Sequence, residues 1–358
     1  MTETTNEFDK VKSNKIIYPI LIGLGVATYM LWQSFQKPGT LEAFELVEFT
    51  WTTLFWLLIA ALLMGGRDLG YMIRIRILSD NHFTWRQAFR VIMLWEFTSA
   101  VTPSAVGGTG LAIIFVNKEG LSIGKGSAVV MATSFLDELY FIIMFPILFL
   151  IVGFSSLFAI DGDVNFAREF MWIAVIGYSV KFLYVIILTY GLFQNPKGLK
   201  WLIMRLFRLR ILRKWFRSAY KATDEIVSNS IELRKKSASF WLKSFSATFF
   251  SWTSRYLVVN ALLLAFFSVN DHILVFARQL VMWIMMLISP TPGGSGFSEF
   301  VFSNYLGDFL PAAGIAVVMA VLWRLYTYYP YLFIGAIILP KWIKEKFLKK
   351  KQVVAKVD

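Results

Sequence analysis

Two Pro- and Gly-rich segments, each set deep within apolar sequence, constrain this chain more than any other feature. The first covers residues 102–110 (TPSAVGGTG) and the second covers residues 289–296 (SPTPGGSG). Neither segment is expected to continue as a helix, because proline lacks a backbone donor and glycine favours turns. At membrane depth, non-helical backbone is tolerated only where protein or a water-filled cavity satisfies its polar groups. The two segments therefore predict two broken hairpins around a transport-type site near the membrane midplane.

The residues expected to break the hairpins share one property, which is that none of them favours a helix interior. They are Pro103, Gly107, Gly108, Gly110, Pro290, Pro292, Gly293, Gly294 and Gly296. Their N–H groups, together with the start of a returning half-helix, form an arrangement that binds anions. We expect a lipid phosphate to fit there.

The rest of the chain has the composition of an integral membrane protein. Hydrophobic residues make up 57% of its 358 residues, and charged residues only 16%. A transmembrane helix needs roughly 17–25 mostly apolar residues. We expect full spans over residues 16–34, 50–73, 126–153, 170–193, 240–267 and 311–339. The expected fold is an all-α polytopic membrane protein with about six full spans and two broken, re-entrant hairpins.

Basic residues are concentrated beside the expected spans and orient the chain. The net charge is +13, and most of the excess lies in residues 197–236 and 341–356. Basic segments of this kind mark the cytoplasmic side and contact anionic lipid, which argues against a nucleic-acid partner. The loops around residues 42–48 and 161–163 are acidic and are assigned to the outside. We expect both termini in the cytoplasm and a location in the bacterial cytoplasmic (inner) membrane; the oligomeric state is left open.

This topology divides the chain into five parts. They are an N-terminal tail (1–15), a first transmembrane unit (16–193), a basic linker with an amphipathic helix (194–238), a second transmembrane unit (239–340) and a basic tail (341–358). The amphipathic start of the linker is expected to lie along the cytoplasmic interface.

The two transmembrane units repeat one pattern in opposite orientations. Arg67 and Arg255 lie 188 positions apart, and the glycines of the two breaks are offset by 186. Each unit runs span, broken hairpin, span. The hairpin over 86–117 enters from the cytoplasm, whereas the hairpin over 273–307 enters from outside. This order predicts an inverted-topology repeat, as found in many secondary transporters.

Ionisable residues inside spans are costly and are therefore functional candidates. The candidates for substrate binding or coupling are Glu96, Asp137, Glu138, Arg255, Glu299 and Arg324. The offset of 186 relates Glu138 to Arg324, so we expect these two side chains to pair across the pseudo-two-fold axis. Such a pair either fixes packing or forms a site that takes a head group or couples to protons.

Other polar and aromatic residues receive structural interpretations. Glu299, three residues after Gly296, either caps the returning half-helix or contacts substrate. Arg67, Asp68 and Lys181 are expected to snorkel to the interface. The abundant Trp and Tyr residues, among them Trp252 and Tyr328, suit interfacial belts.

Several kinds of chemistry are disfavoured. The chain has no cysteine, which excludes disulfides and thiolate metal sites. Its two histidines, His82 and His272, lie far apart in sequence and flank different spans. No Ser/His/Asp arrangement or nucleotide-binding loop is evident. We therefore expect no cofactor, no metal and no enzymatic activity.

The motifs TPSAVGGTG and SPTPGGSGFSEF, with SFLDELYFII after the first, resemble the flippase-like transmembrane domain of lysylphosphatidylglycerol synthases and its stand-alone relatives. The resemblance covers roughly residues 15–340, and PGGSGFSE is its most specific part. Asp137 lies where this family has an acidic residue. The arginine that members often carry after the first glycine pair is absent, since residues 111–115 read LAIIF. We expect a member without the aminoacyltransferase domain, because only a short basic tail follows the last expected span.

The resemblance implies movement of a lipid between leaflets. The leading hypothesis is a flippase-like transporter that carries a phospholipid or lipid-linked sugar through a polar cavity between the two hairpins. Two alternatives stay open: a membrane-embedded enzyme acting on lipid head groups, and a transporter for a small polar solute or ion.

Overall fold

The computed structural model describes residues 28–29, 32, 36, 48–102, 107–158, 164–206, 208, 220, 227–228, 230–286, 289, 291 and 293–348. Pro103, Pro290, Pro292, the tail 1–15, the residues after 348, the acidic loop at 161–163 and most of the expected span 16–34 and of the linker lie outside these ranges. The regular elements within them are all helical, with no strand.

Five helical segments in the described part of the chain are long and apolar enough to cross a membrane. They are Trp51–Leu78, Ile123–Val152, Met171–Thr189, Ala238–Phe266 and Gly314–Lys346. These coincide with five of the six expected spans and confirm an all-α polytopic membrane protein. The first four correspond to α4 (Trp51–Leu78), α7 (Ile123–Val152), α9 (Val164–Thr189) and α12 (Ala238–Phe266). Shorter elements are α8 (Phe154–Phe158) and α10 (Pro196–Leu206), the latter preceded by a π-helical turn at Tyr190–Gln194.

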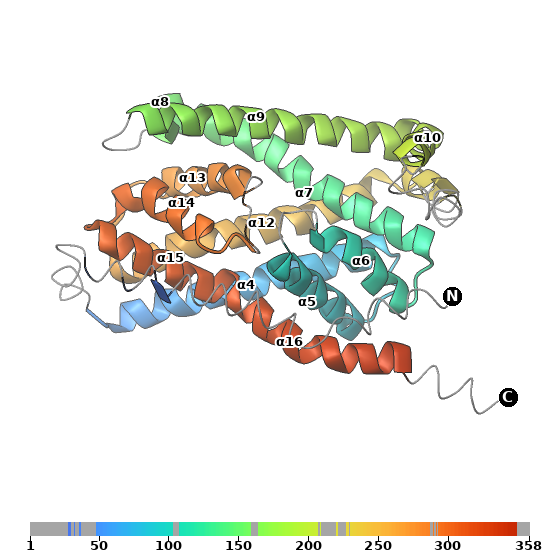
Figure 1. The fold of residues 1–358 in the computed structure, drawn as a ribbon, viewed down its shortest axis with the longest axis horizontal. Coiled ribbons are helices and arrows are strands. Elements are labelled where there is room, and N and C mark those ends of the chain that lie inside the picture. The colour runs from blue at the N-terminus through green and yellow to red at the C-terminus, as the bar shows by residue number, and fades with distance from the viewer. Residues whose placement is uncertain are drawn as a thin grey trace.

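The segments around the two breaks form helix pairs that are too short to span the bilayer singly. The first pair is α5 (Trp85–Val101) and α6 (Gly107–Lys118), and the second is α13 (His272–Met285) and α14 (Phe297–Tyr305). Even the 17 residues of α5 extend only about 26 Å, against a hydrocarbon core of about 30 Å. Figure 1 shows the two pairs in opposite halves of the long axis, while α4 and α12 run along its length.

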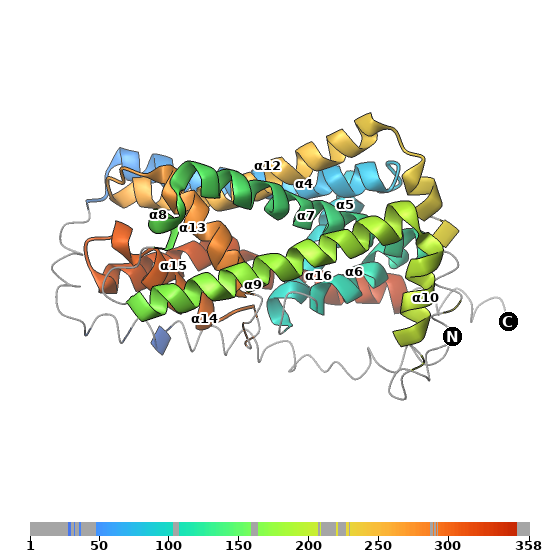
Figure 2. The same cartoon turned by 90° about the horizontal axis from the view of Figure 1, so that it is seen from above.

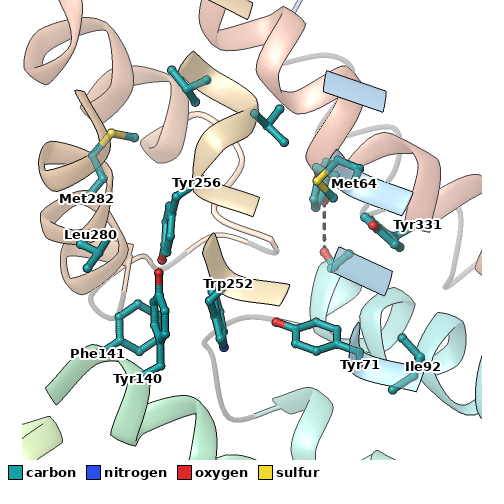
Figure 3. Close-up of a cluster of buried hydrophobic side chains, with 14 of the residues drawn as sticks. Met64, Tyr71, Ile92, Tyr140, Phe141, Trp252, Tyr256, Leu280, Met282 and Tyr331 are labelled. Carbon is teal, nitrogen blue, oxygen red and sulfur yellow. Dashed lines mark hydrogen bonds between the residues drawn. The ribbon is translucent and has the colours of Figure 1, made fainter. Parts of the chain in front are cut away.

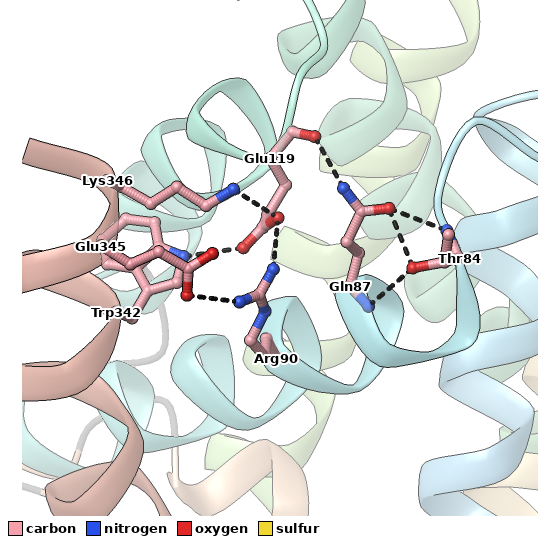
Figure 4. A network of polar contacts seen from close by, with 7 residues as sticks. All are labelled: Thr84, Gln87, Arg90, Glu119, Trp342, Glu345 and Lys346. Atoms are coloured by element: carbon pink, nitrogen blue, oxygen red, sulfur yellow. Dashed lines mark hydrogen bonds and ion pairs between the residues drawn. The ribbon is translucent and has the colours of Figure 1, made fainter. Parts of the chain in front are cut away.

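A buried carboxylate, that of Glu119, links the two helices of the first pair at the ends farthest from the break between them. The side chain of Glu119, just after α6, is fully buried. It accepts hydrogen bonds from Arg90 of α5 at 2.9 Å and from the indole of Trp342 at 2.8 Å, and it pairs with Lys346 at 2.9 Å (Figure 4). The side chain of Gln87 also donates to the Glu119 carbonyl at 3.2 Å. Both legs of this hairpin therefore end on the same side of the bundle.

An arginine closes the second pair at its own outer end. Arg278 of α13 donates to the carbonyl of Tyr305, where α14 ends, at 2.9 Å. It also binds Asp308 in the 3-10 turn Gly307–Phe309 at 2.8 Å and the Ser156 carbonyl of α8 at 3.3 Å. Arg90 and Arg278 lie 188 positions apart, the same offset that relates Arg67 to Arg255. Each hairpin thus carries an arginine at the equivalent place.

Basic residues gather at the end of the bundle where the first hairpin closes. Helix α10 lies there in both views (Figures 1 and 2) and carries Lys197, Lys200 and Arg205. The π-helical turn Lys344–Leu348 that follows α16 lies at the same end, since Lys346 contacts Glu119. We call this the basic end.

The last expected span, 311–339, is not one continuous helix. It is split into α15 (Ala313–Thr327) and α16 (Tyr329–Ile343) at Tyr328, whose φ of −133° and ψ of −59° are not helical. Pro330, the second residue of α16, has no N–H to bond the Tyr326 carbonyl and so helps to interrupt the hydrogen-bond ladder. Helix α15 packs on α14, whereas α16 packs on α5. Each half of the span therefore accompanies a different hairpin.

The contact between α4 and α12 depends on small residues. A Cβ at Gly70 would collide with the Ser251 hydroxyl and press on the Ala247 carbonyl, and Gly66 faces Phe250 at close range. The Ser251 hydroxyl donates to the Arg67 carbonyl at 2.9 Å. Small residues spaced four apart allow helices to approach closely in lipid, where no hydrophobic force drives association. Helices α4 and α12 are joined in this way.

We expect Gly70→Val to separate α4 from α12. Overpacking at such a contact costs about 1–3 kcal/mol, so the midpoint of thermal unfolding in detergent should fall and less protein should elute as a single species. Gly65→Val is the matched control, because a Cβ at Gly65 meets nothing within 4 Å. Equal behaviour of the two variants would contradict this account of the contact.

Candidate functional site

A cavity lies between the helix pairs and the long helices. It has a volume of about 540 Å³ and is lined by residues of α4–α7, α9 and α12–α16. Its charged lining residues are Arg67, Arg74, Glu96, Asp137, Glu138, Lys181, Arg255 and Arg324. The structure thus brings five of the six predicted candidate residues to one cavity, whereas Glu299 is not on its wall.

Arg67 is buried in the protein, and the expectation that it snorkels to the interface is wrong. The residue is 1% exposed and pairs with Asp68 at 2.7 Å and Glu96 at 2.5 Å. Its guanidinium also lies 4.5 Å and 4.8 Å from the ring centres of Tyr71 and Tyr331. Asp68 accepts from the Tyr331 hydroxyl at 2.9 Å, so it too is held inside the bundle. Two carboxylates and two aromatic faces replace the water that the guanidinium lacks.

Asp137 ties three helices together. Its carboxylate pairs with Arg74 of α4 and accepts from the indole of Trp252 of α12 at 2.6 Å. Trp252 was expected in an interfacial belt, but it is 5% exposed and lines the cavity, as does Arg74, which is 3% exposed. A sequence signal existed for Arg74: it follows Arg67 by seven residues, about two helical turns, and so shares its face.

The predicted pair between Glu138 and Arg324 is wrong. Glu138 is bound by Lys181 of α9, whose Nζ lies 2.8 Å and 2.7 Å from the two carboxylate oxygens. Lys181 is 4% exposed and therefore does not snorkel either. Arg324 instead pairs with Glu299 at 3.2 Å and donates to the Gly293 carbonyl at 2.9 Å. The offset of 186 on which the prediction relied gave no sign of Lys181, because α9 lies outside the segments that this offset relates.

Two amides of the second glycine-rich break, which we expected to be available to an anion, are already bonded within the protein. The N–H of Gly294 bonds the Thr291 carbonyl at 3.0 Å, and the N–H of Gly296 bonds the Glu299 carboxylate at 2.8 Å. Glu299 also accepts from the Ser298 hydroxyl at 2.8 Å and is 1% exposed. Of the two interpretations of Glu299, this geometry favours the cap.

Tyr328 joins the inner ends of both helix pairs. Its hydroxyl donates to the Ala100 carbonyl of α5 at 3.1 Å. Gly293 has a φ of +57°, and a Cβ there would collide with the Tyr328 ring, so only glycine suits this position. The Arg324 guanidinium lies 3.5 Å from the centre of the same ring. Tyr328, which we expected at the interface, is instead a wall of the cavity.

Arg255 differs from the other cavity cations. Among the described residues it alone of the five has no carboxylate within ion-pair distance, and its guanidinium lies 5.6 Å and 5.5 Å from the ring centres of Trp252 and Trp283. Figure 3 shows that Trp252 lies between Tyr256 and Phe141 on one side and Tyr71 on the other, and its ring contacts all three. In the part of the chain that the structure describes, no three His, Cys, Asp or Glu side chains are grouped for a metal ion.

Sequence comparisons with known proteins give matches over nearly the whole chain. The family model described as lysylphosphatidylglycerol synthase TM region matches residues 20–335. A UPF0104 membrane protein of Archaeoglobus fulgidus is 27% identical over 320 residues, which cover 85% of this chain and 93% of that relative. The family match includes both helix pairs and every lining residue of the cavity.

We expect the Glu138–Lys181 pair to be revealed by a double-mutant cycle. Removing one partner of a buried pair leaves an uncompensated charge and costs about 3–5 kcal/mol, so Glu138→Gln and Lys181→Gln should each lower the thermal midpoint. The double variant Glu138→Gln/Lys181→Gln should recover most of the loss. Glu138→Gln/Arg324→Gln is the control and should show no recovery; recovery there instead would favour the pairing that the structure contradicts.

Proposed function

Because the chain belongs to the lysylphosphatidylglycerol synthase transmembrane family, we propose that it is a flippase-like transporter of a phospholipid or lipid-linked sugar. The observation that carries the proposal is the charged cavity enclosed between two helix pairs too short to span the membrane. Its volume of about 540 Å³ falls within the range of about 300–1,000 Å³ that is usual for small-ligand sites. It suits a head group, while the acyl chains stay in the bilayer.

An inverted-topology repeat with re-entrant hairpins is the second part of the proposal. Helix α4 shifted by 188 positions falls on α12, and Arg90 shifted by the same number falls on Arg278. The equivalent arginines close hairpins that occupy opposite halves of the molecule (Figure 1). These relations support alternating access by rocking one repeat against the other.

We further propose that the basic end faces the cytoplasm. The cations of α10 and of the end of α16 lie there, and positive residues next to spans are retained on the cytoplasmic side. In this orientation the first hairpin enters from the cytoplasm and the second from outside. Anionic lipid in the inner leaflet of a bacterial cytoplasmic membrane is the partner that these cations suit.

The cavity supports transport better than catalysis. A membrane-embedded enzyme needs a carboxylate that is free to take or give a proton. Glu96, Asp137 and Glu138 are each bound to a cation. A small-solute transporter is the remaining alternative, and the experiment below separates it from a lipid transporter.

We expect purified protein in proteoliposomes to accelerate exchange of head-group-labelled phospholipid between leaflets, measured by an impermeant quencher. Ser134→Trp should abolish most of this acceleration, because Ser134 lines the cavity and the larger side chain occupies it. Ile147→Trp is the matched control on the same helix, since Ile147 is 43% exposed on the outer surface.

Three results would count against lipid transport. The first is that anionic, zwitterionic and polyprenyl-linked lipids, tested in turn, all exchange no faster than in empty liposomes. Equal loss in Ser134→Trp and Ile147→Trp would place the pathway outside the cavity. Uptake of a water-soluble phosphate ester without lipid exchange would favour the solute transporter.

A further inference from the structure

Arg67 and Arg255 occupy equivalent positions in the two proposed repeats, but their surroundings differ. Arg67 is neutralised by Asp68, the next residue, and by Glu96 on the following helix. Shifted by 188 positions, these two carboxylates become Tyr256 and Ile284. Arg255, the counterpart of Arg67, therefore has neither acidic partner. The second repeat keeps the cation and has uncharged residues in place of both groups that balance it in the first.

A cation without a counter-charge is costly at membrane depth. The other four cavity cations each have a carboxylate within 3.2 Å. Within the described ranges of the chain, Arg255 has only the faces of Trp252 and Trp283. Cation–π contacts are weaker than a hydrogen-bonded ion pair and leave the N–H groups of the guanidinium unbonded. The N–H groups of Arg255, which is half-buried, are thus available to an anion in the cavity.

Two further donors on the same cavity also lack acceptors. The hydroxyl of Tyr256 and the indole N–H of Trp283 are buried and have no hydrogen-bond partner in the described structure. Tyr256 as a whole is 5% exposed. Buried polar groups are nearly always bonded, and the neighbouring indole of Trp252 illustrates this by donating to Asp137. Arg255, Tyr256 and Trp283 all line the cavity, so its second-repeat side offers donors and a positive charge without an acceptor.

We propose that Arg255, Tyr256 and Trp283 form a phosphate-binding site inside the cavity. A guanidinium presents paired N–H groups that match two phosphate oxygens, and the hydroxyl and indole supply additional donors. The four other cations are each paired with a carboxylate, so Arg255 is the cation of the cavity that a phosphate group would pair with. The proposal rests on the proposed function in naming the source of the phosphate, which is the head group of a membrane lipid.

The test measures binding directly and so is independent of transport. Full-length protein in an uncharged detergent is titrated calorimetrically with dihexanoyl phosphatidylglycerol, with inorganic phosphate and with dihexanoylglycerol, which has no phosphate. We expect the phospholipid to bind and dihexanoylglycerol not to. Arg255→Gln should weaken phospholipid binding roughly 10- to 100-fold, the range for loss of a charged hydrogen-bonding group. Arg255→Lys, which keeps the charge but loses the planar fork, should fall in between.

Matched variants separate binding from folding. Lys243→Gln removes an exposed cation from the same helix and should leave the affinity unchanged. Without ligand, Arg255→Gln should unfold at the wild-type temperature or above, because it removes an uncompensated charge. Arg67→Gln should unfold at a lower temperature, because it strands two carboxylates. A loss in Arg255→Gln as large as that in Arg67→Gln would show a structural role for Arg255 and overturn the proposal.

The proposed phosphate site and the proposed transport function can each be disproved without the other. Wild-type protein that exchanges lipid but binds phospholipid no better than Arg255→Gln would overturn the phosphate site and leave transport intact. Arg255-dependent binding with no lipid exchange would keep the site and remove the transporter. Inorganic phosphate bound as tightly as the phospholipid would overturn the lipid source.

Discussion

The close contact between α4 and α12 is the constraint on which the rest of the fold depends. In lipid, helices associate through packing and hydrogen bonds rather than through hydrophobic burial. Gly66, Gly70 and Ser251 allow the two backbones to approach closely. Helix α4 packs on α5 and helix α12 packs on α13, the first helix of each pair. Their contact therefore sets where both hairpins lie and places Arg67 and Arg255 on a common cavity.

Charge balance in the cavity also determines which helices are joined. Arg74 and Asp137 connect α4 to α7, and Lys181 connects α9 to α7. Arg324 connects α15 to the start of α14 through Glu299. Neither member of such a pair is easily left alone in a low-dielectric interior, since the remaining charge has no water to solvate it. The pairs thus define which neighbours each helix keeps, and Arg255 stands out because it joins no helix in this way.

Local signals carried most of the fold prediction, and contacts between distant segments limited the rest. Hydropathy located the described spans, and the Pro/Gly segments located both hairpins, since each signal is contained within a short window. The prediction that Gly107, Gly108 and Gly110 belong to the broken backbone is wrong, because all three lie in helix α6. The partner of Glu138 was missed because Lys181 belongs to α9, a helix outside the segments that the expected repeat relates. The break at Tyr328 had a sequence signal in Pro330, but its contact with Ala100 lies 228 positions away and leaves no mark in the sequence. Gathering five candidate residues at one cavity followed from the expected repeat, whereas their pairing depended on side-chain packing.

The break at Tyr328 divides the last span into two helices that can change their relative angle at this residue. Helix α15 is bound to the second hairpin and α16 to the first, and Tyr328 touches the inner ends of both. The 15 residues of α16 make an arm of about 22 Å. A turn of about 5° at the joint displaces the far end of an arm of that length by about 2 Å. A small angular change at Tyr328 would therefore produce a larger displacement at the far end of α16, where Trp342 contacts Glu119.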